Sequence, residues 1–171
     1  LLVLLFRVRP FTRRMAKKIA DLVATGSTVL EIGSGKAEAD GSYYFSVKKY
    51  FDSRGVTFIC SDRDASFGHR SIDVTTFDEE NVYDHILCFH VLDDIYEWQH
   101  ALLNLTRALR VGGTVHIILP VFNGFDLTAD YYRFSEKLLR TFCEKEGLRI
   151  TEFYIHGYRV FPFAYYMAIT T

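Results

Sequence analysis

Short apolar runs recur along the chain, and most of them end at a glycine, a proline or an acidic residue. The runs at 28–32, 56–60, 83–89 and 114–119 have the length of strands. Their near-continuous hydrophobicity is typical of parallel strands that are buried on both faces. A shorter strand is expected at 70–72, so the pattern predicts a largely buried sheet.

Between these runs, apolar residues recur at helical spacing. Helices are therefore expected at 12–24, 42–54, 98–109 and 135–146. Glycine follows several of these stretches, as is common at the C-terminal ends of helices, and the pair Gly112-Gly113 is expected to end the third. Strands that alternate with helices predict an α/β sandwich.

The chain closes with two strand-like runs, at 148–155 and 161–169, that are separated by a few residues around Gly157. A connection this short cannot contain a crossover helix, so the two runs are expected to pair antiparallel at an edge of the sheet. Among α/β sandwiches, five parallel strands followed by such a hairpin identify a fold more specifically than six parallel strands would.

The first strong strand carries the most informative motif, because Val29 to Gly35 read Val-Leu-Glu-Ile-Gly-Ser-Gly. Gly33 and Gly35 allow a tight turn and a close approach of a ligand to the backbone. A dinucleotide site needs helix-terminal N–H groups for its pyrophosphate and disfavours extra negative charge. The carboxylate of Glu31 instead suits the sulfonium and ammonium groups of S-adenosylmethionine.

Length and composition narrow the class of protein. The 171 residues fit one domain, expected over 1–171 with 1–11 as an N-terminal segment. The formal net charge of −1 gives no general attraction to nucleic acid or to an anionic membrane. The apolar run at 1–6 is too short to span a bilayer, so no stable membrane insertion is expected.

The cysteines and histidines give no sign of a disulfide framework or a metal site. Cys60, Cys88 and Cys143 are odd in number and far apart, which favours reduced thiols in a cytoplasmic protein. The six histidines make no metal-ligand spacing with these cysteines, and no metal is expected. The oligomeric state stays open.

Four stretches, in order, resemble motifs of the class I S-adenosylmethionine-dependent methyltransferases, the type 11-like members included. They are Val29 to Gly35, Phe58 to Asp62, Tyr83 to Leu92, and Leu105 to Thr114 with its double glycine. The segment Asp130 to Phe134 is similar to one in members that accompany polysaccharide biosynthesis. The resemblance covers most of the chain, and its strength lies in the order and spacing of the motifs.

The resemblance implies a Rossmann-like, seven-stranded, mostly parallel sheet with helices on both faces. Its strand order is 3-2-1-4-5-7-6 with strand 7 antiparallel, and its cofactor is S-adenosyl-L-methionine. The sequence departs from the family at Ala37, where a third glycine is usual, and at Asp93-Asp94, where many relatives have an acid–histidine pair. The charged loop at 36–41 is also long.

The resemblance also implies which residues hold the cofactor. They are Glu31, Gly33, Ser34, Gly35, Asp62, Asp73, Val74 and Phe89. Glu31 and the glycine turn would hold the methionine part, Asp62 the ribose hydroxyls, and Asp73 with Val74 the adenine. Asp64 competes with Asp62 for the ribose, and a solvated or helix-capping role is the plain alternative for each acid.

Catalytic and substrate-binding candidates follow the fourth and fifth strands. His90, Asp94 and Asp130 are candidate catalytic groups, His90 because imidazole titrates near neutrality. Candidates for substrate binding are Asp126, Tyr131 and Arg133. A histidine bonded into the strand end and plain packing or pairing of the loop residues are the alternatives.

The expected reaction moves a methyl group to an oxygen or nitrogen of a small molecule or glycan precursor. The proline-rich run of amino-methylating DNA enzymes is missing after the fourth strand, and no basic stripe points to nucleic acid. A dinucleotide-binding oxidoreductase would need glycine three residues after Gly35, where the chain has Glu38. The alternative is a non-catalytic module that binds the same cofactor or a partner.

Overall fold

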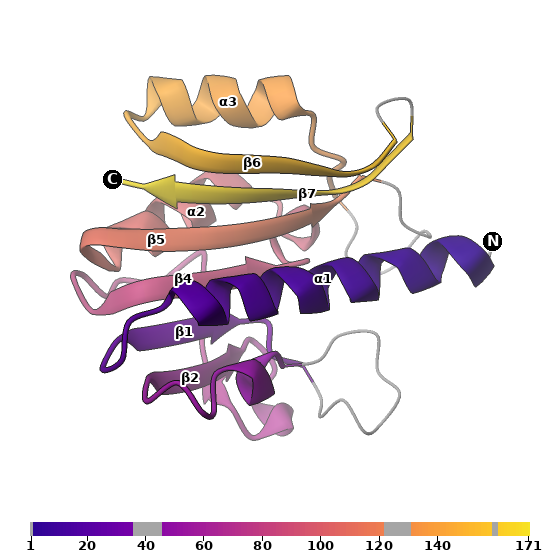
Figure 1. Cartoon of the computed structure of the whole chain (residues 1–171). Coiled ribbons are helices and arrows are strands. Elements are labelled where there is room, and N and C mark those ends of the chain that lie inside the picture. Colours follow the sequence, from indigo (N-terminus) through magenta and orange to yellow (C-terminus); the bar gives the residue numbers. More distant parts are fainter. Residues whose placement is uncertain (1, 36–45, 122–130, 159–160) are drawn as a thin grey trace.

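The apolar runs form the seven strands of one sheet in the computed structural model, which describes residues 2–35, 46–121, 131–158 and 161–171 (Figure 1). The strands are β1 (Thr28–Ile32), β2 (Thr57–Asp62), β3 (Arg70–Ser71), β4 (Tyr83–Phe89), β5 (Leu109–Pro120), β6 (Arg149–Tyr158) and β7 (Phe161–Thr170). Their order is β3-β2-β1-β4-β5-β7-β6. Strand β7 runs antiparallel to β5 and β6, and the other pairs are parallel. The predicted strand order and hairpin are confirmed.

Helices cover both faces of this sheet, as expected. The described helices are α1 (Leu2–Leu22), α2 (Trp98–Arg107) and α3 (Glu136–Lys145), with short 3-10 turns η2 (Lys48–Tyr50), η3 (Ala65–Phe67) and η4 (Leu92–Asp94). Alternate residues of each strand face opposite sides, so Leu30 joins a core beneath α2 and α3 while Val29 joins a core beneath α1.

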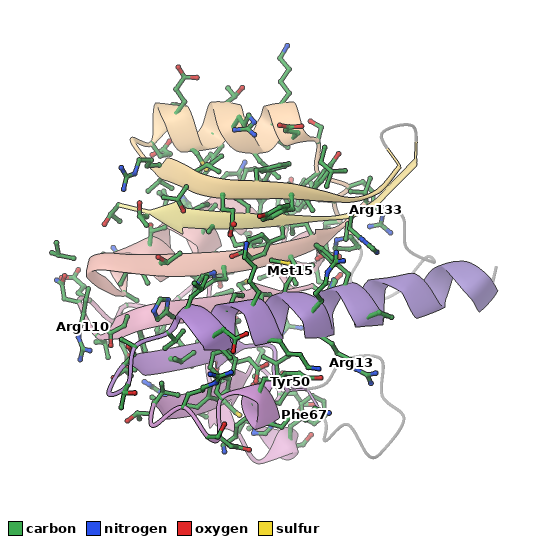
Figure 2. The ribbon with its side chains drawn as sticks, viewed as in Figure 1. Arg13, Met15, Tyr50, Phe67, Arg110 and Arg133 are labelled. Carbon is green, nitrogen blue, oxygen red and sulfur yellow. The ribbon has the colours of Figure 1, made fainter. Side chains whose placement is uncertain are left out.

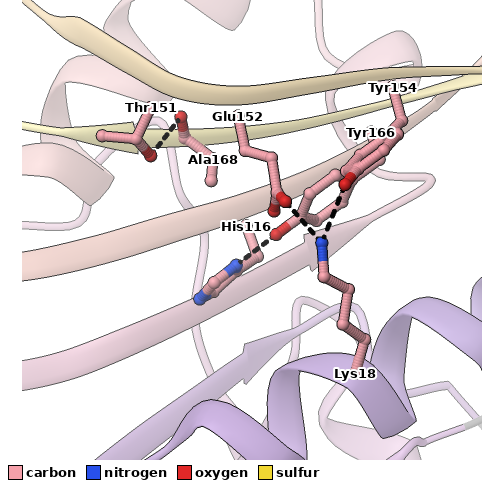
Figure 3. Close-up of polar contacts among 7 residues, drawn as sticks. All are labelled: Lys18, His116, Thr151, Glu152, Tyr154, Tyr166 and Ala168. Atoms are coloured by element: carbon pink, nitrogen blue, oxygen red, sulfur yellow. Dashed lines mark hydrogen bonds and ion pairs between the residues drawn. The ribbon is translucent and has the colours of Figure 1, made fainter.

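Helix α1 is held against its face of the sheet by apolar packing and by polar contacts. Met15 and Ile19 are buried against the strands. Lys18 pairs with Glu152 of β6 and donates a hydrogen bond to the Tyr154 hydroxyl over 3.1 Å (Figure 3). Within the described residues, neither α1 nor any other helix combines the length and hydrophobicity that crossing a bilayer requires.

A row of buried polar groups continues under α1. The hydroxyl of Tyr166 lies 2.8 Å from Nδ1 of His116, and Nε2 of His116 lies 3.2 Å from Nδ1 of His85. Burial lowers the pKa of His116 to about 3 and lowers that of His85 as well. Both imidazoles are therefore neutral in the folded protein at pH 7.

Two helix predictions need correction. Helix α1 begins at Leu2 instead of residue 12, so the apolar residues before Thr12 continue the helix. The helix expected at 42–54 is wrong in its described part, residues 46–54, where η2 is the only helical segment. The backbone there is held by a tertiary contact, because the Val47 N–H donates to the Glu31 carboxylate over 2.7 Å.

The double glycine was expected to end a helix, and this prediction is wrong. Helix α2 ends at Arg107, and Gly112 and Gly113 lie inside β5, where the register with β4 shifts. A Cβ on Gly113 would lie 2.9 to 3.1 Å from the carbonyl oxygens of Arg110, Asp84 and Tyr83. Glycine is needed at 113 because two backbone segments approach too closely for a side chain.

Candidate functional site

The neighbouring strands β1 and β4 end side by side, at the point in the sheet where the strand order reverses. Strand β1 lies between β2 and β4, so the chain leaves it to one side and returns on the other. In open α/β sheets, ligands bind outside the carboxyl ends of strands at such a point. Figure 2 shows Arg133 on the side of the sheet where the parallel strands end and Arg110 on the side where they begin. The glycine turn after β1 and the residues after β4 therefore define the candidate site.

Glu31 is a buried acid of this site, with 4% of its surface exposed. Its Oε2 accepts hydrogen bonds from the hydroxyls of Ser34 at 2.8 Å and Ser46 at 2.6 Å, and its Oε1 accepts from Val47 N. Burial raises the pKa of Glu31, and these hydrogen bonds oppose that shift. Protein donors thus engage both oxygens, and a direct contact between Glu31 and a ligand stays a prediction.

The turn after β1 needs its first glycine for two reasons. Gly33 has a φ of 71°, and a Cβ there would lie 2.5 Å from Cγ2 of Val91, which follows β4. Ser34 N donates to the carbonyl of Ser61 over 2.9 Å. The turn is therefore fixed between the ends of β2 and β4.

Asp62 lies beside this turn, whereas Asp64 does not. One carboxylate oxygen of Asp62 accepts the N–H of Gly35 at 2.9 Å, and the other accepts the N–H of Asp64 at 3.0 Å. The Asp64 carboxylate turns back on its own segment and caps η3 through Ser66 N at 2.9 Å. Of the two acids weighed for the ribose, Asp62 has the geometry of a site residue.

Asp73 and Val74 are placed differently from each other. Asp73 is exposed, and its Oδ1 accepts the backbone N–H and the hydroxyl of Thr75 at 2.9 and 2.7 Å. These bonds lower the pKa of Asp73. Val74 is buried in the core beneath α2, whose Asn104 side chain donates to the Val74 carbonyl over 3.0 Å. Their contact with an adenine ring stays a prediction.

The end of β4 brings Phe89 and His90 toward α1. Phe89 packs into the core beneath that helix. His90 has a φ of 57°, an uncommon backbone conformation for a residue with a side chain. Its Nε2 lies 2.9 Å from the hydroxyl of Thr12. Burial lowers the pKa of His90 to about 4, so titration near neutrality, expected from the sequence, is corrected.

The segment after β4 is tied to the segment before α3. The carbonyl of Asp93 in η4 accepts the backbone N–H groups of Tyr131 and Tyr132 at 3.0 and 3.1 Å. Asp94 is half-buried beside it. The remaining acids predicted for this region, Asp126 and Asp130, lie outside the described residues, as does Ala37.

The predicted substrate residues Tyr131 and Arg133 are both exposed. Nη1 of Arg133 donates to the carbonyl of Tyr132 over 3.0 Å. The ring of Tyr131 stands edge-on to Tyr96, with 5.7 Å between the centroids. Sequence reasoning missed Tyr96 and Thr12. The position of Tyr96, an aromatic residue soon after the end of β4, could have pointed to it. Nothing in the sequence around Thr12 indicated its contact with His90.

The thiols add no further reactive group to the site. All three cysteines are free, with Cys88 and Cys143 buried and Cys60 half-buried. Burial raises the pKa of each, for Cys143 to about 11. In the part of the chain that the structure describes, no group of three histidine, cysteine or acidic side chains is placed to hold a metal ion.

Comparison with known proteins gives no match at the level of sequence and a clear one at the level of structure. No model of a protein family matches the chain. No curated protein matches it either. The solved structures that resemble it include methyltransferases and a cyclase.

Three of these structures illustrate the likeness. The 1,6-didemethyltoxoflavin-N1-methyltransferase of Burkholderia thailandensis, with S-adenosylhomocysteine bound, is 18% identical at a TM-score of 0.68, over 93% of this chain and 78% of that one. A SAM-dependent methyltransferase from Archaeoglobus fulgidus is 12% identical at 0.69, over 95% and 94%. The 4+2 cyclase SpnF is 13% identical at 0.66, over 92% and 79%. The chain therefore has the fold of class I S-adenosylmethionine-dependent methyltransferases.

Proposed function

We propose that this protein is an S-adenosylmethionine-dependent methyltransferase that acts on an oxygen or nitrogen of a small molecule or glycan precursor. The observation that carries the proposal is the turn after β1, which glycine geometry, Glu31 and Asp62 fix at the reversal of strand order. The bound S-adenosylhomocysteine of the similar methyltransferase supports the choice of cofactor.

The described residues suit such a cofactor. The close contact of Gly33 with Val91 shows a backbone turn with no room for a side chain, and Asp62 holds a half-buried carboxylate beside it. In the proposal, the backbone of Gly33 to Gly35 holds the methionine part, and Asp62 accepts from the ribose hydroxyls. Asp73, Val74 and Phe89 would contact the rest of the cofactor. Glu31 would fix the turn and place its carboxylate beside the positive groups of the methionine part.

The bound cofactor would supply an electrophilic methyl group on sulfur. The work of the protein is then to align the acceptor and exclude water, which can lower the barrier by several kcal/mol. His90, with a pKa of about 4, is neutral at pH 7 and a weak proton acceptor. It is better suited to orient an acceptor hydroxyl or amine, while Asp94 and Asp130 stay candidates for accepting its proton.

Calorimetry with S-adenosylhomocysteine and NAD tests the cofactor. We expect binding of the first and none of the second. Asp62→Ala should weaken binding at least about tenfold, as loss of a charged hydrogen-bond acceptor does, and Asp64→Ala, the matched control, should leave binding unchanged. Binding of NAD alone, or equal affinity in wild type and Asp62→Ala, would overturn the proposal.

We place this activity in one cytoplasmic domain over residues 1–171, a choice supported by the three free thiols. A second candidate is a cofactor-binding module that transfers no methyl group. The likeness to a cyclase favours keeping it, because that protein has the same fold and a different chemistry. Incubation with methyl-labelled cofactor and fractionated cell extract separates the two, since a silent module binds the cofactor and labels nothing.

A further inference from the structure

Two strongly exposed tyrosines stand together near the candidate site. Tyr96, which follows η4, is 64% exposed, and Tyr131, which precedes α3, is 57% exposed. They are far apart in the sequence, yet their ring centroids are 5.7 Å apart in an edge-to-face arrangement. Aromatic side chains gathered in water at one rim indicate a surface that a ligand covers.

These tyrosines adjoin aromatic residues that reach into the core. The Tyr132 hydroxyl donates to the Tyr96 carbonyl over 3.0 Å, and the Tyr132 ring lies 5.7 Å from Phe134. Phe134 in turn packs edge-on against buried Trp98 at 5.0 Å. A surface whose support reaches the core offers a preformed ring face and costs little entropy on binding.

The same tyrosines are coupled to the glycine turn. Asp93, whose carbonyl binds the backbone of Tyr131 and Tyr132, comes two residues after Val91, which packs against Gly33. Arg133 follows the two tyrosines and lies at the carboxyl-end edge of the sheet (Figure 2). The segment that carries Tyr131 is thus tied by hydrogen bonds to the residues that follow β4, beside the turn where the cofactor is proposed to bind.

We propose that Tyr96 and Tyr131 form a platform for the methyl acceptor, and that the acceptor carries a ring with a flat apolar face. The proposal rests on the proposed function and narrows its substrate class. A tyrosine ring stacks with an aromatic ring or covers the C–H face of a sugar, and both leave a polar group at the ring edge free to reach the reaction centre. Acyclic acceptors lack the flat ring face that these side chains would cover.

Ring binding is measured by saturation-transfer NMR, with S-adenosylhomocysteine present, using indole, methyl β-D-glucopyranoside and tert-butanol as probes. We expect indole or the glucoside to bind and tert-butanol not to bind. Tyr96→Ala and Tyr131→Ala should each weaken the ring signal about fivefold, the scale of one lost aromatic contact. Tyr96→Phe should keep it, and so should Tyr154→Ala, which removes an exposed tyrosine of β6.

Calorimetry with S-adenosylhomocysteine on the same variants separates the two proposals. Unchanged affinity for that compound together with a lost ring signal supports the platform. If neither ring probe binds better than tert-butanol, or all variants give the wild-type signal, the platform is wrong while cofactor binding still stands. If the rings bind but S-adenosylhomocysteine does not, the proposed function fails, and with it the identification of the bound ring as a methyl acceptor. An indole-only or glucoside-only signal identifies the kind of ring.

Discussion

At the scale of single residues, the site depends on buried polar groups that the protein itself satisfies. Glu31 is buried and accepts three hydrogen bonds from Ser34, Ser46 and Val47. His90 is paired with Thr12, 78 residues earlier in the chain. A local pattern identified Glu31 and His90, because each lies at the end of an apolar run. Ser34 belongs to the same motif as Glu31, but Ser46, Val47 and Thr12 come from other segments, and no spacing rule within one segment reveals such contacts.

Replacing Glu31 tests its role as an anchor. Glu31→Ala should lower the free energy of unfolding by about 3 kcal/mol, because buried donors lose their acceptor. Glu31→Gln should cost less, since one acceptor oxygen remains. Urea denaturation followed by circular dichroism measures both. Glu97→Gln, at an exposed acid before α2, is the control, and wild-type stability in Glu31→Ala would refute the role.

Acid should destabilise the protein partly through His90. Its pKa is about 4 in the folded state and near the ordinary 6.5 when unfolded. Because the unfolded state binds the proton more readily, the contribution is present above pH 6.5 and is lost as pH falls toward 4. The urea midpoint should therefore differ less between pH 7 and pH 4.5 in His90→Gln than in wild type. His100→Gln, on the exposed side of α2, should keep the full difference.

At the scale of elements, the type of most elements was predictable, whereas several boundaries and the helix expected at 42–54 were not. The strand at 114–119 lengthens to Leu109–Pro120, because a glycine pair that is typical of a helix end serves a close contact between strands. The segment from 46 onward has helical spacing, yet a hydrogen bond to a neighbouring strand holds it. In both places a tertiary contact overrides the local pattern.

Alanine substitutions in the glycine pair distinguish close contact from backbone conformation. Gly113→Ala should cost about 3 kcal/mol, since its Cβ meets three carbonyl oxygens. Gly112 has a φ of 82° and open space around it, so Gly112→Ala should cost about 1 kcal/mol. Thermal unfolding of both variants gives the comparison. Equal losses would show that the strands at this point separate easily.

At the scale of the whole molecule, α1 joins regions that are distant in the sheet. Its Thr12 contacts His90 at the end of β4, and its Lys18 contacts Glu152 on the edge strand β6. The overall strand order was predicted from the resemblance to class I methyltransferases, and the antiparallel hairpin at the end of the chain agrees with it. The placement of α1 was not, since it depends on contacts with strands that are far apart in the sequence.

Binding of S-adenosylhomocysteine should slow backbone hydrogen exchange only near the carboxyl ends of the parallel strands. With S-adenosylhomocysteine, hydrogen exchange should slow in peptides covering 29–35, 58–63 and 89–94, because stabilising the bound state suppresses local opening there. Peptides covering 108–114, at the opposite edge, serve as the internal control. Uniform slowing would indicate global stabilisation instead, and slowing confined to 108–114 would contradict the location of the site.

The carboxylate of Glu31 receives Ser34 from one side of segment 36–45 and Ser46 with Val47 from the other. One buried carboxylate therefore binds the residues on both sides of segment 36–45. Substitutions or insertions within 36–45 should leave the sheet in place, because the free-energy cost of closing a connection grows slowly with its length. A library of variants within 36–45 should therefore keep Ser34 and Ser46 in their hydrogen bonds to Glu31.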